Sequence, residues 1–181
     1  MNAIIENLLT RRSTRAFLQK EIPDNELNEI LQAAIYAPSG MGKQTWKFTV
    51  LCNQEKIQQL AELIGRKLGR KGYDMYRPQV LIIPSNQKEN PHGMEDNACA
   101  LENIFLAAHS FGIGSVWINQ LRTLCDDPEV RALLDEFEIP SDHVVYGMAA
   151  LGYPADATQK GNPQNRRDPD YQNKTDRRFY R

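Results

Sequence analysis

The sequence predicts one domain in which helices and strands are mixed. A chain of 181 residues has the usual size of a single domain, which buries about 70% of the surface that its unfolded chain exposes. Segments with helical and with strand patterns follow one another up to residue 151, without an internal repeat. We therefore treat residues 1–181 as one domain, of which residues 155–181 form an extended C-terminal arm.

Five segments carry apolar residues at the spacing of a helix face. Asp24 is expected to cap the second helix at its N-terminus, and Pro38 ends it because the residue before proline is pushed out of the helical region. Gly112 should end the fourth helix, the most apolar, which we take as the central or interface helix. The expected helices are residues 3–12, the segment between Asp24 and Pro38, and residues 54–69, 95–111 and 130–137.

Four segments rich in β-branched or aromatic residues are expected to be strands: residues 46–52, 79–84, 114–118 and 143–151. The second of them is continuously apolar, which predicts burial on both faces of a sheet. Trp46 is expected to be a core aromatic that anchors the preceding loop. The polar residues 85–94 predict a mobile surface loop.

The composition argues against several classes of function. A net charge of −1 does not indicate a nucleic-acid partner or an anionic membrane surface. No apolar run approaches the roughly 18 residues of a membrane helix, and no signal-peptide pattern is seen. The three cysteines, expected to be mostly buried, have no CxxC spacing and predict reduced thiols in a cytoplasmic protein. The three histidines lack the spacing of a metal motif, so no metal site is expected.

Two segments have the chemistry of a flavin site. Residues 11–15, RRSTR, combine guanidinium forks with hydroxyls, which suits a phosphate group. Residues 37–46, APSGMGKQTW, form a loop whose glycines let backbone N–H groups approach a planar ligand. The first segment lies at a helix C-terminus, which does not itself bind anions, so side chains must attract the phosphate. The alternative is an ordinary solvated basic helix end.

Four segments in order resemble the sequence pattern of the nitroreductase family of flavin-dependent oxidoreductases. The family pattern comprises a basic RRSxR start, an APSxxNxQPW loop, a DxxxAxxNxxLAAxxxGxGxxW helix and strand, and a closing LGYP. The matching segments are Arg11–Arg15, Ala37–Trp46, Asp96–Trp117 and Leu151–Pro154. Each alone is weak, but four in the family's order and spacing are specific.

The resemblance implies an α+β fold with a mixed, mainly antiparallel central sheet flanked by helices. It also implies a homodimer with two FMN sites at the interface, each built from both chains. The polar residues 155–181 carry the aromatic residues Tyr171, Phe179 and Tyr180. The tail is either a disordered end or an arm that reaches across to the partner, and the resemblance favours the arm.

The resemblance also implies roles at the phosphate end of FMN. Arg11 and Ser13 would bind the phosphate, and Arg12 belongs to the same cofactor-binding segment. A basic residue after the LGYP turn would help, for which Arg166 is the first candidate. Arg15 would lie near N1 and O2 of the flavin, where a cation stabilises the reduced anion. Lys160 and Arg167 are the alternatives to Arg166.

At the ring, the resemblance implies that Gly114 and Ser115 bring backbone N–H groups to the isoalloxazine near N5. The partner chain would contribute the turn that opens the loop. Gln44 would brace that loop. Asp96 and Asn97 would cap the interface helix and have no catalytic role. The partner's loop residues would be Pro38, Ser39 and Gly40.

The loop departs from the family pattern at two positions. Gly42 stands where the family has Asn, and Thr45 stands where it has Pro. The loss of the Asn side chain leaves only backbone near the flavin, which puts the substrate preference in question. Lys43 could reach the pocket or face water.

The resemblance implies ping-pong hydride transfer from NADH or NADPH to the flavin, and then to a nitroaromatic, a quinone or a similar electron-poor small molecule. The flavin is the reacting centre, so no catalytic side chain is expected. A flavin-destroying, dehalogenating or desaturating enzyme is the alternative within the same fold. Outside enzymes, the alternatives are a flavin-binding store or sensor without turnover and a structural dimer without cofactor.

Overall fold

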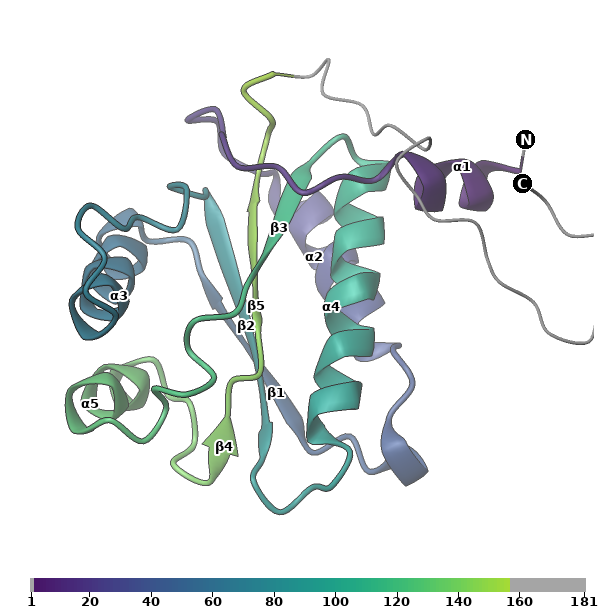
Figure 1. Ribbon diagram of the computed structural model, residues 1–181. Coiled ribbons are helices and arrows are strands. Elements are labelled where there is room, and N and C mark those ends of the chain that lie inside the picture. Colours follow the sequence, from purple (N-terminus) through teal and green to yellow (C-terminus); the bar gives the residue numbers. More distant parts are fainter. Residues whose placement is uncertain (1, 157–181) are drawn as a thin grey trace, which may run out of the picture.

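The computed structural model of the chain describes residues 2–156, which form a sheet between two pairs of helices (Figure 1). Helices α2 and α4 cover one face of the sheet, and α3 and α5 cover the other. The helices are α1 (Ala3–Thr10), α2 (Asp24–Ile35), the 3₁₀ turn η1 (Gly40–Gly42), α3 (Gln54–Lys67), α4 (Gly93–Ser110) and α5 (Pro128–Glu136). The strands are β1 (Trp46–Leu51), β2 (Val80–Gln87), β3 (Gly114–Ile118), β4 (His143–Val144) and β5 (Met148–Gly152).

The sheet has the order β1-β2-β5-β3, and β4 also pairs with β2. Every pairing between these strands is antiparallel. A parallel bridge between Ser13 and Ser115 adds the N-terminal segment beside β3. The α+β fold with a mixed, mainly antiparallel sheet is therefore confirmed.

Strand β2 is the centre of the two cores. Its residues Val80 and Ile82 pack with α2 and α4, whereas Leu81 and Ile83 pack with α3 and α5. Because successive side chains of a strand point to opposite faces, a strand covered on both faces is apolar throughout. The burial of this segment on both faces is confirmed.

The expected strand at residues 143–151 is interrupted. Val80 and Asn86 of β2 pair with Leu151 and Val144, so the seven residues 80–86 lie opposite the eight residues 144–151. The extra residue forms a bulge between β4 and β5, so the prediction of one continuous strand was wrong. Gly147 lies in this bulge, where an added Cβ would come 2.5 Å from the indole of Trp117.

Helix α4 is the central helix of the described chain, with contacts to α1, α2, η1 and strands β1, β2, β3 and β5. Gly112 ends it as expected, with φ +72°. The N–H groups of Gly112 and Ile113 donate to the carbonyls of His109 and Ala108, the pattern of a Schellman cap.

Three local expectations were wrong. Asp24 is the first residue of α2 and not its N-cap, since Pro23 occupies that position without a capping side chain. Residues 85–87 belong to β2 and not to a surface loop, because Asn86 pairs with β1 on one side and with β4 on the other. Trp46 is half-buried rather than a core residue. The expectation that the cysteines are mostly buried was also wrong, since Cys125 is buried, Cys99 is half-buried and Cys52 is exposed.

Helix α1 stands away from the sheet and contacts the rest of the described chain mainly at α4 (Figure 1). It is anchored by Asn7, whose side-chain amide donates to the carbonyl of Leu106 at 2.9 Å. Four apolar side chains of α1 are exposed by 46–70%: Ile4, Ile5, Leu8 and Leu9. Among residues 2–156, no helix is long and apolar enough to cross a membrane.

Candidate functional site: a cavity beside the C-terminus of α4

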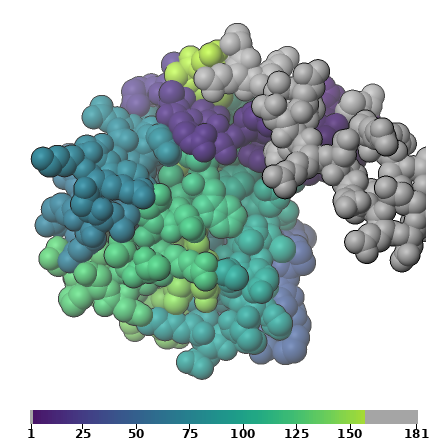
Figure 2. All heavy atoms as spheres, in the orientation of Figure 1, coloured from purple at the N-terminus to yellow at the C-terminus, as the bar shows by residue number. Residues whose placement is uncertain are grey.

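A cavity of about 320 Å³ lies where the N-terminal segment meets the turn between α4 and β3. Figure 2 shows the N-terminal segment, in purple, lying against the teal and green residues of this region. The cavity brings two predicted groups of site residues together, the basic segment and the glycine-led strand. Its lining includes Arg11, Arg12, Ser13, Thr14, His109, Gly112, Ile113, Gly114 and Ser115, with Glu6, Thr10, Pro154 and Asp156 at the remaining walls.

Backbone contacts hold the basic segment beside β3. The N–H group of Thr14 donates to the carbonyl of Ser115 at 2.8 Å, next to the bridge between Ser13 and Ser115. An added Cβ on Gly114 would lie 2.5 Å from the Thr14 hydroxyl oxygen. A glycine is therefore required at position 114 by the close approach of Thr14.

The closing LGYP motif extends the same contact. The N–H group of Leu18 donates to the carbonyl of Tyr153 at 2.8 Å, and Phe17 forms a bridge with Pro154. An added Cβ on Gly152 would lie 2.9 Å from the Phe17 ring. Two segments of the predicted pattern that are far apart in sequence thus fix the course of the N-terminal segment.

The cavity combines cations with acidic side chains at its rim. Arg11 has its Nε 3.8 Å from a carboxylate oxygen of Glu102, which is half-exposed, and its guanidinium lies 5.9 Å from the centre of the Phe105 ring. At that distance and exposure the ion pair is weak, so the guanidinium remains able to bind a stronger anion. Glu6 and Asp156 also line the cavity and would lie near that anion.

His109 is a cavity residue that sequence reasoning missed. Its Nε2 lies 2.9 Å from the Thr10 hydroxyl oxygen. Burial lowers the pKa of His109, and the positive charge of Arg11 lowers it further. Its position just before the glycine pair Gly112 and Gly114 was the available signal, because a residue in the last turn of α4 must lie beside the glycine-led strand.

The remaining predicted site residues do not reach this cavity within one chain. Arg15 is exposed and does not line it. Arg166, its alternatives Lys160 and Arg167, and the expected C-terminal arm lie outside the described residues. The loop residues Pro38, Ser39, Gly40 and Gln44 lie at the opposite end of α4, which has 18 residues. A helix of that length measures about 27 Å.

At that opposite end, Asp96 and Asn97 do not cap α4 as expected. His92 is the N-cap residue, and the Asp96 carboxylate instead accepts a hydrogen bond from the N–H group of Gly40 at 2.7 Å. Asn97 donates to the carbonyl of Pro84 at 3.2 Å. Gln44 is exposed, and its backbone N–H donates to the Ser39 hydroxyl at 2.9 Å. The loop is thus braced by backbone contacts at Gln44.

A larger cavity of about 570 Å³ lies between α3 and the following turn. It is lined by residues of 58–77 and includes none of the predicted site residues. Its basic side chains follow the C-terminus of α3, where cations compensate the negative end of the helix dipole. The smaller cavity is therefore the better candidate.

Comparison with known proteins identifies the family of the chain. The sequence model of the nitroreductase family matches residues 8–79 and 67–153. The chain belongs to the nitroreductase family.

The solved structures it resembles include a nitroreductase with bound FMN from Bacteroides fragilis NCTC 9343. The two are 40% identical, with a TM-score of 0.82 over 99% of this chain and 100% of the other. An FMN-dependent nitroreductase from Clostridium difficile R20291 is 32% identical, with a TM-score of 0.76 over 89% and 93% of the two chains. The FMN reductase (NADPH) of Bacillus subtilis strain 168 is 27% identical over 88% of this chain and 69% of its own length.

Proposed function

We propose that this chain is an FMN-dependent oxidoreductase that uses NADH or NADPH to reduce a nitroaromatic, a quinone or a similar electron-poor small molecule. The carrying observation is the cavity in which Arg11, Arg12 and Ser13 meet Gly114 and Ser115. The similarity to a nitroreductase with bound FMN supports the cofactor, and the similarity to an FMN reductase (NADPH) supports the reductant.

The cavity residues suit the phosphate end of FMN. Arg11 and Arg12 supply forked N–H donors, which match a phosphate better than a single ammonium does. Ser13 is exposed, so its hydroxyl is accessible to a ligand. A volume of about 320 Å³ is at the lower end of ligand pockets, which suits one end of a cofactor rather than the whole. A bound phosphate would take Arg11 from its weak pairing with Glu102.

Bound FMN would supply the redox chemistry, by accepting hydride from the nicotinamide and passing it to the acceptor. The protein itself would hold the cofactor and orient its ring. Gly114 and Ser115 are buried at the cavity wall, where their backbone is fixed by pairing with β5. Such a fixed wall can orient a planar ring without a side chain that moves protons.

We also propose that the working unit is a homodimer. The exposed apolar side chains of α1 form a face that the described chain leaves uncovered, and exposed apolar faces mark interaction sites. The 38–45 loop and the basic cavity lie at opposite ends of α4, so one chain does not bring them together. In a dimer, the loop of one protomer can cover the cavity of its partner.

Three further assignments belong to this proposal. Residues 1–181 would act as one domain, since the two cores share strand β2. Arg166 would assist Arg11 at the phosphate. The free thiols suit a reducing compartment such as the cytoplasm.

Purification and a flavin assay test the proposal. We expect a yellow protein with about one FMN per chain, bleached by NADH or NADPH and reoxidised by menadione or nitrofurazone. A colourless protein that rejects added FMN would contradict the cofactor. A yellow protein that neither reductant bleaches would instead support the alternative, a flavin store or sensor. Arg166→Ala, compared with Arg11→Ala, tests the assignment of the phosphate helper.

A further inference from the structure

A buried network of polar side chains holds the 38–45 loop at both of its ends. At one end, Asp96 accepts from the N–H group of Gly40 at 2.7 Å. At the other end, the Thr45 hydroxyl donates to Asn86 at 2.6 Å. The side-chain amide of Asn90 joins the two ends, lying 2.9 Å from the Thr45 hydroxyl oxygen, 3.3 Å from Asn86 Oδ1 and 3.0 Å from Asp96 Oδ2.

The charged member of the network is buried. Asp96 is 3% exposed, and both of its carboxylate oxygens accept hydrogen bonds, from Gly40 and from Asn90. No ion pair joins it to a basic side chain within residues 2–156. Its place in the first turn of α4 puts the carboxylate at the positive end of the helix dipole. A buried charge held in this way is strongly sensitive to the loss of a partner.

The loop between these two contacts has a strained backbone. Met41 and Gln44 have φ values of 56° and 48°, which non-glycine residues seldom adopt, and Gly42 has 64°. Met41 is 75% exposed, so packing of its side chain does not explain the conformation. Gly40 is confined as well, because an added Cβ would lie 2.6 Å from the His92 ring. The shape of the loop is therefore imposed from its ends.

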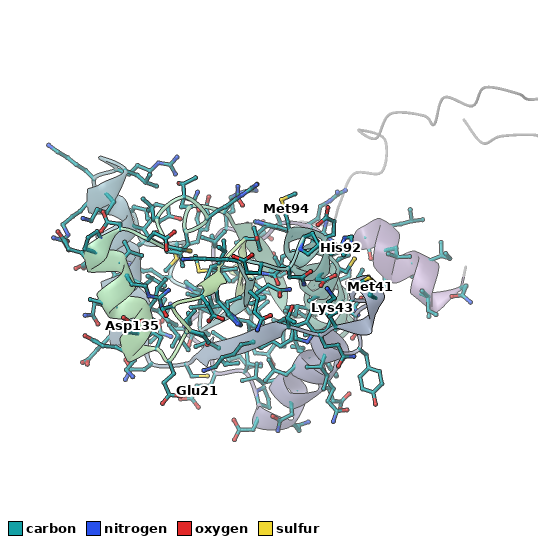
Figure 3. All side chains as sticks on the ribbon, turned by 90° about the horizontal axis from the view of Figure 1, so that it is seen from below. Glu21, Met41, Lys43, His92, Met94 and Asp135 are labelled. Carbon is teal, nitrogen blue, oxygen red and sulfur yellow. The ribbon has the colours of Figure 1, made fainter. Side chains whose placement is uncertain are left out.

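The network displays a group of side chains at the surface. Figure 3 shows Met41, Lys43, His92 and Met94 near one another, in the half of the view that also contains α1. Met94 is 43% exposed and follows the N-cap of α4. Strained segments held by their surroundings are typical of functional sites, where fixed geometry matters more than local stability.

We propose that Thr45 and Asp96 are positioning residues, which fix the 38–45 loop in the conformation that meets the flavin and the electron acceptor. This inference rests on the proposed function, in which the loop covers the cofactor of the partner. Thr45 stands where the family pattern has Pro, and proline could neither donate to Asn86 nor accept from Asn90. The Thr45 hydroxyl thus fixes the C-terminal end of the 38–45 loop through its hydrogen bonds with Asn86 and Asn90.

A pair of substitutions at Thr45 separates the hydroxyl from the shape of the side chain. Thr45→Val removes the hydroxyl at nearly constant volume, whereas Thr45→Ser keeps it. Thr123→Val, at an exposed position outside the network, is the control for the chemical change alone. Hydrogen exchange of residues 38–45 should be about tenfold faster in Thr45→Val, as the loss of one hydrogen bond predicts, and unchanged in the other two variants.

A charge swap tests the Asp96 contact. Asp96→Asn places two amide donors against each other at Asn90, so it should loosen the loop in the same exchange measurement. In the double variant Asp96→Asn, Asn90→Asp, the new amide at 96 faces a carboxylate and can still accept from Gly40, whereas residue 90 can no longer donate to Thr45 and Asn86. That variant should recover slow exchange at the Gly40 end of the loop but not at the Thr45 end, a pattern that a general loss of stability would not give.

The positioning role is read from steady-state kinetics on flavin-loaded protein. In Thr45→Val the KM for menadione should rise severalfold while the kcat changes less, because a loose loop weakens acceptor binding more than hydride transfer. Thr45→Ser should retain the parental KM. Equal exchange in Thr45→Val and Thr45→Ser would overturn the network, and faster exchange with an unchanged KM would overturn the positioning role. If the parent protein binds no flavin, the proposed function fails and the positioning role with it, whereas the exchange data still decide the network.

Discussion

The two ends of α4 lie beside side chains of opposite charge. At the C-terminal end, Arg11 and Arg12 line an open cavity and the chain supplies positive charge. At the N-terminal end, the buried carboxylate of Asp96 ties down a strained loop. Each charge has the sign that the helix dipole favours at that end. At the C-terminal end the arginines are therefore the groups that can attract an anionic ligand. At the N-terminal end the Asp96 carboxylate already has its hydrogen-bond partners within the chain.

The two ends of α4 are therefore suited to different roles. The cavity end has Arg11 in a weak ion pair and an exposed hydroxyl at Ser13, which suits the capture of a ligand. The loop end has a buried hydrogen-bond network that holds both ends of the 38–45 loop, and it suits the display of a fixed surface. Variants that damage one end should therefore leave the other intact, and the following predictions use that separation.

The largest effect is expected at Gly114. In Gly114→Ala the added Cβ would lie 2.5 Å from the Thr14 hydroxyl oxygen, and Thr14 cannot retreat easily because its N–H is bound to Ser115. Such overpacking costs about 1–3 kcal/mol, and displacement of the basic segment should abolish FMN retention. Thermal unfolding and flavin content measure both effects.

A matched control for Gly114 is Gly69→Ala. Gly69 has φ +65° but open space around it, so alanine there adds backbone strain without a clash near the cavity. It should lower stability and leave FMN content unchanged. If Gly114→Ala retained full flavin, contact between Thr14 and Gly114 would not position the cavity.

The next effect is expected at Arg11. A hydrogen bond to a charged group contributes about 1.5–3 kcal/mol, so Arg11→Ala should weaken FMN binding by about tenfold to a hundredfold. Arg66→Ala removes a guanidinium from an exposed ion pair far from the cavity and should have no effect on FMN. Fluorescence titration of the flavin-free protein measures the affinity. Equal affinities in the two variants would remove Arg11 from the phosphate site.

In the proposed homodimer the two ends of α4 meet across the interface, so loss of the dimer should disturb both. Leu8→Glu places a charge on the exposed apolar face of α1, where Leu8 is 46% exposed. The variant should dissociate at micromolar concentration and shed FMN, while its helix content stays unchanged because α1 buries none of its residues in the described chain. Light scattering with size-exclusion chromatography measures the mass.

Leu18→Glu is the control for this surface change, since Leu18 is 47% exposed but lies outside α1. It should remain dimeric. A parent protein that is monomeric with bound FMN would contradict the shared site.

The smallest effect is a pH dependence of stability. The pKa of His109 lies below its ordinary value because of burial and Arg11, and burial likewise lowers the pKa of His143. As the pH falls, the unfolded chain therefore binds more protons than the folded chain. The free energy of unfolding should be highest above about pH 6.5 and should decline below it. Urea unfolding at a series of pH values measures the decline, and His109→Gln should reduce its slope.

The cavity assignment sharpens this pH prediction. A phosphate bound beside Arg11 would favour the charged imidazole of His109 and so oppose the decline, whereas His143, beside Ser85, would not respond. Addition of FMN should therefore flatten only the part of the slope that His109→Gln removes. An equal effect of FMN in His109→Gln and in the parent would separate His109 from the ligand.

Much of the fold could be predicted because it depends on local patterns. The apolar stripe of α4, the Gly112 cap and the continuous apolar run of β2 each carry their structure in a few neighbouring residues. The predictions were wrong where contacts with residues distant in sequence decide the local structure. Asn86 looks like a loop residue by composition, yet it is fully buried, and its amide oxygen accepts hydrogen bonds from Thr45 and Asn90.

The family, the order of elements and the basic segment can be read from the sequence, since these depend on residue types at fixed spacing. Which groups meet depends on the tertiary structure: Thr14 lies against Gly114, His109 lines the cavity, and Asp96 accepts from Gly40. These close contacts and buried hydrogen bonds depend on how α4 is oriented relative to the segments at its two ends, and residues that are neighbours in sequence do not specify that orientation.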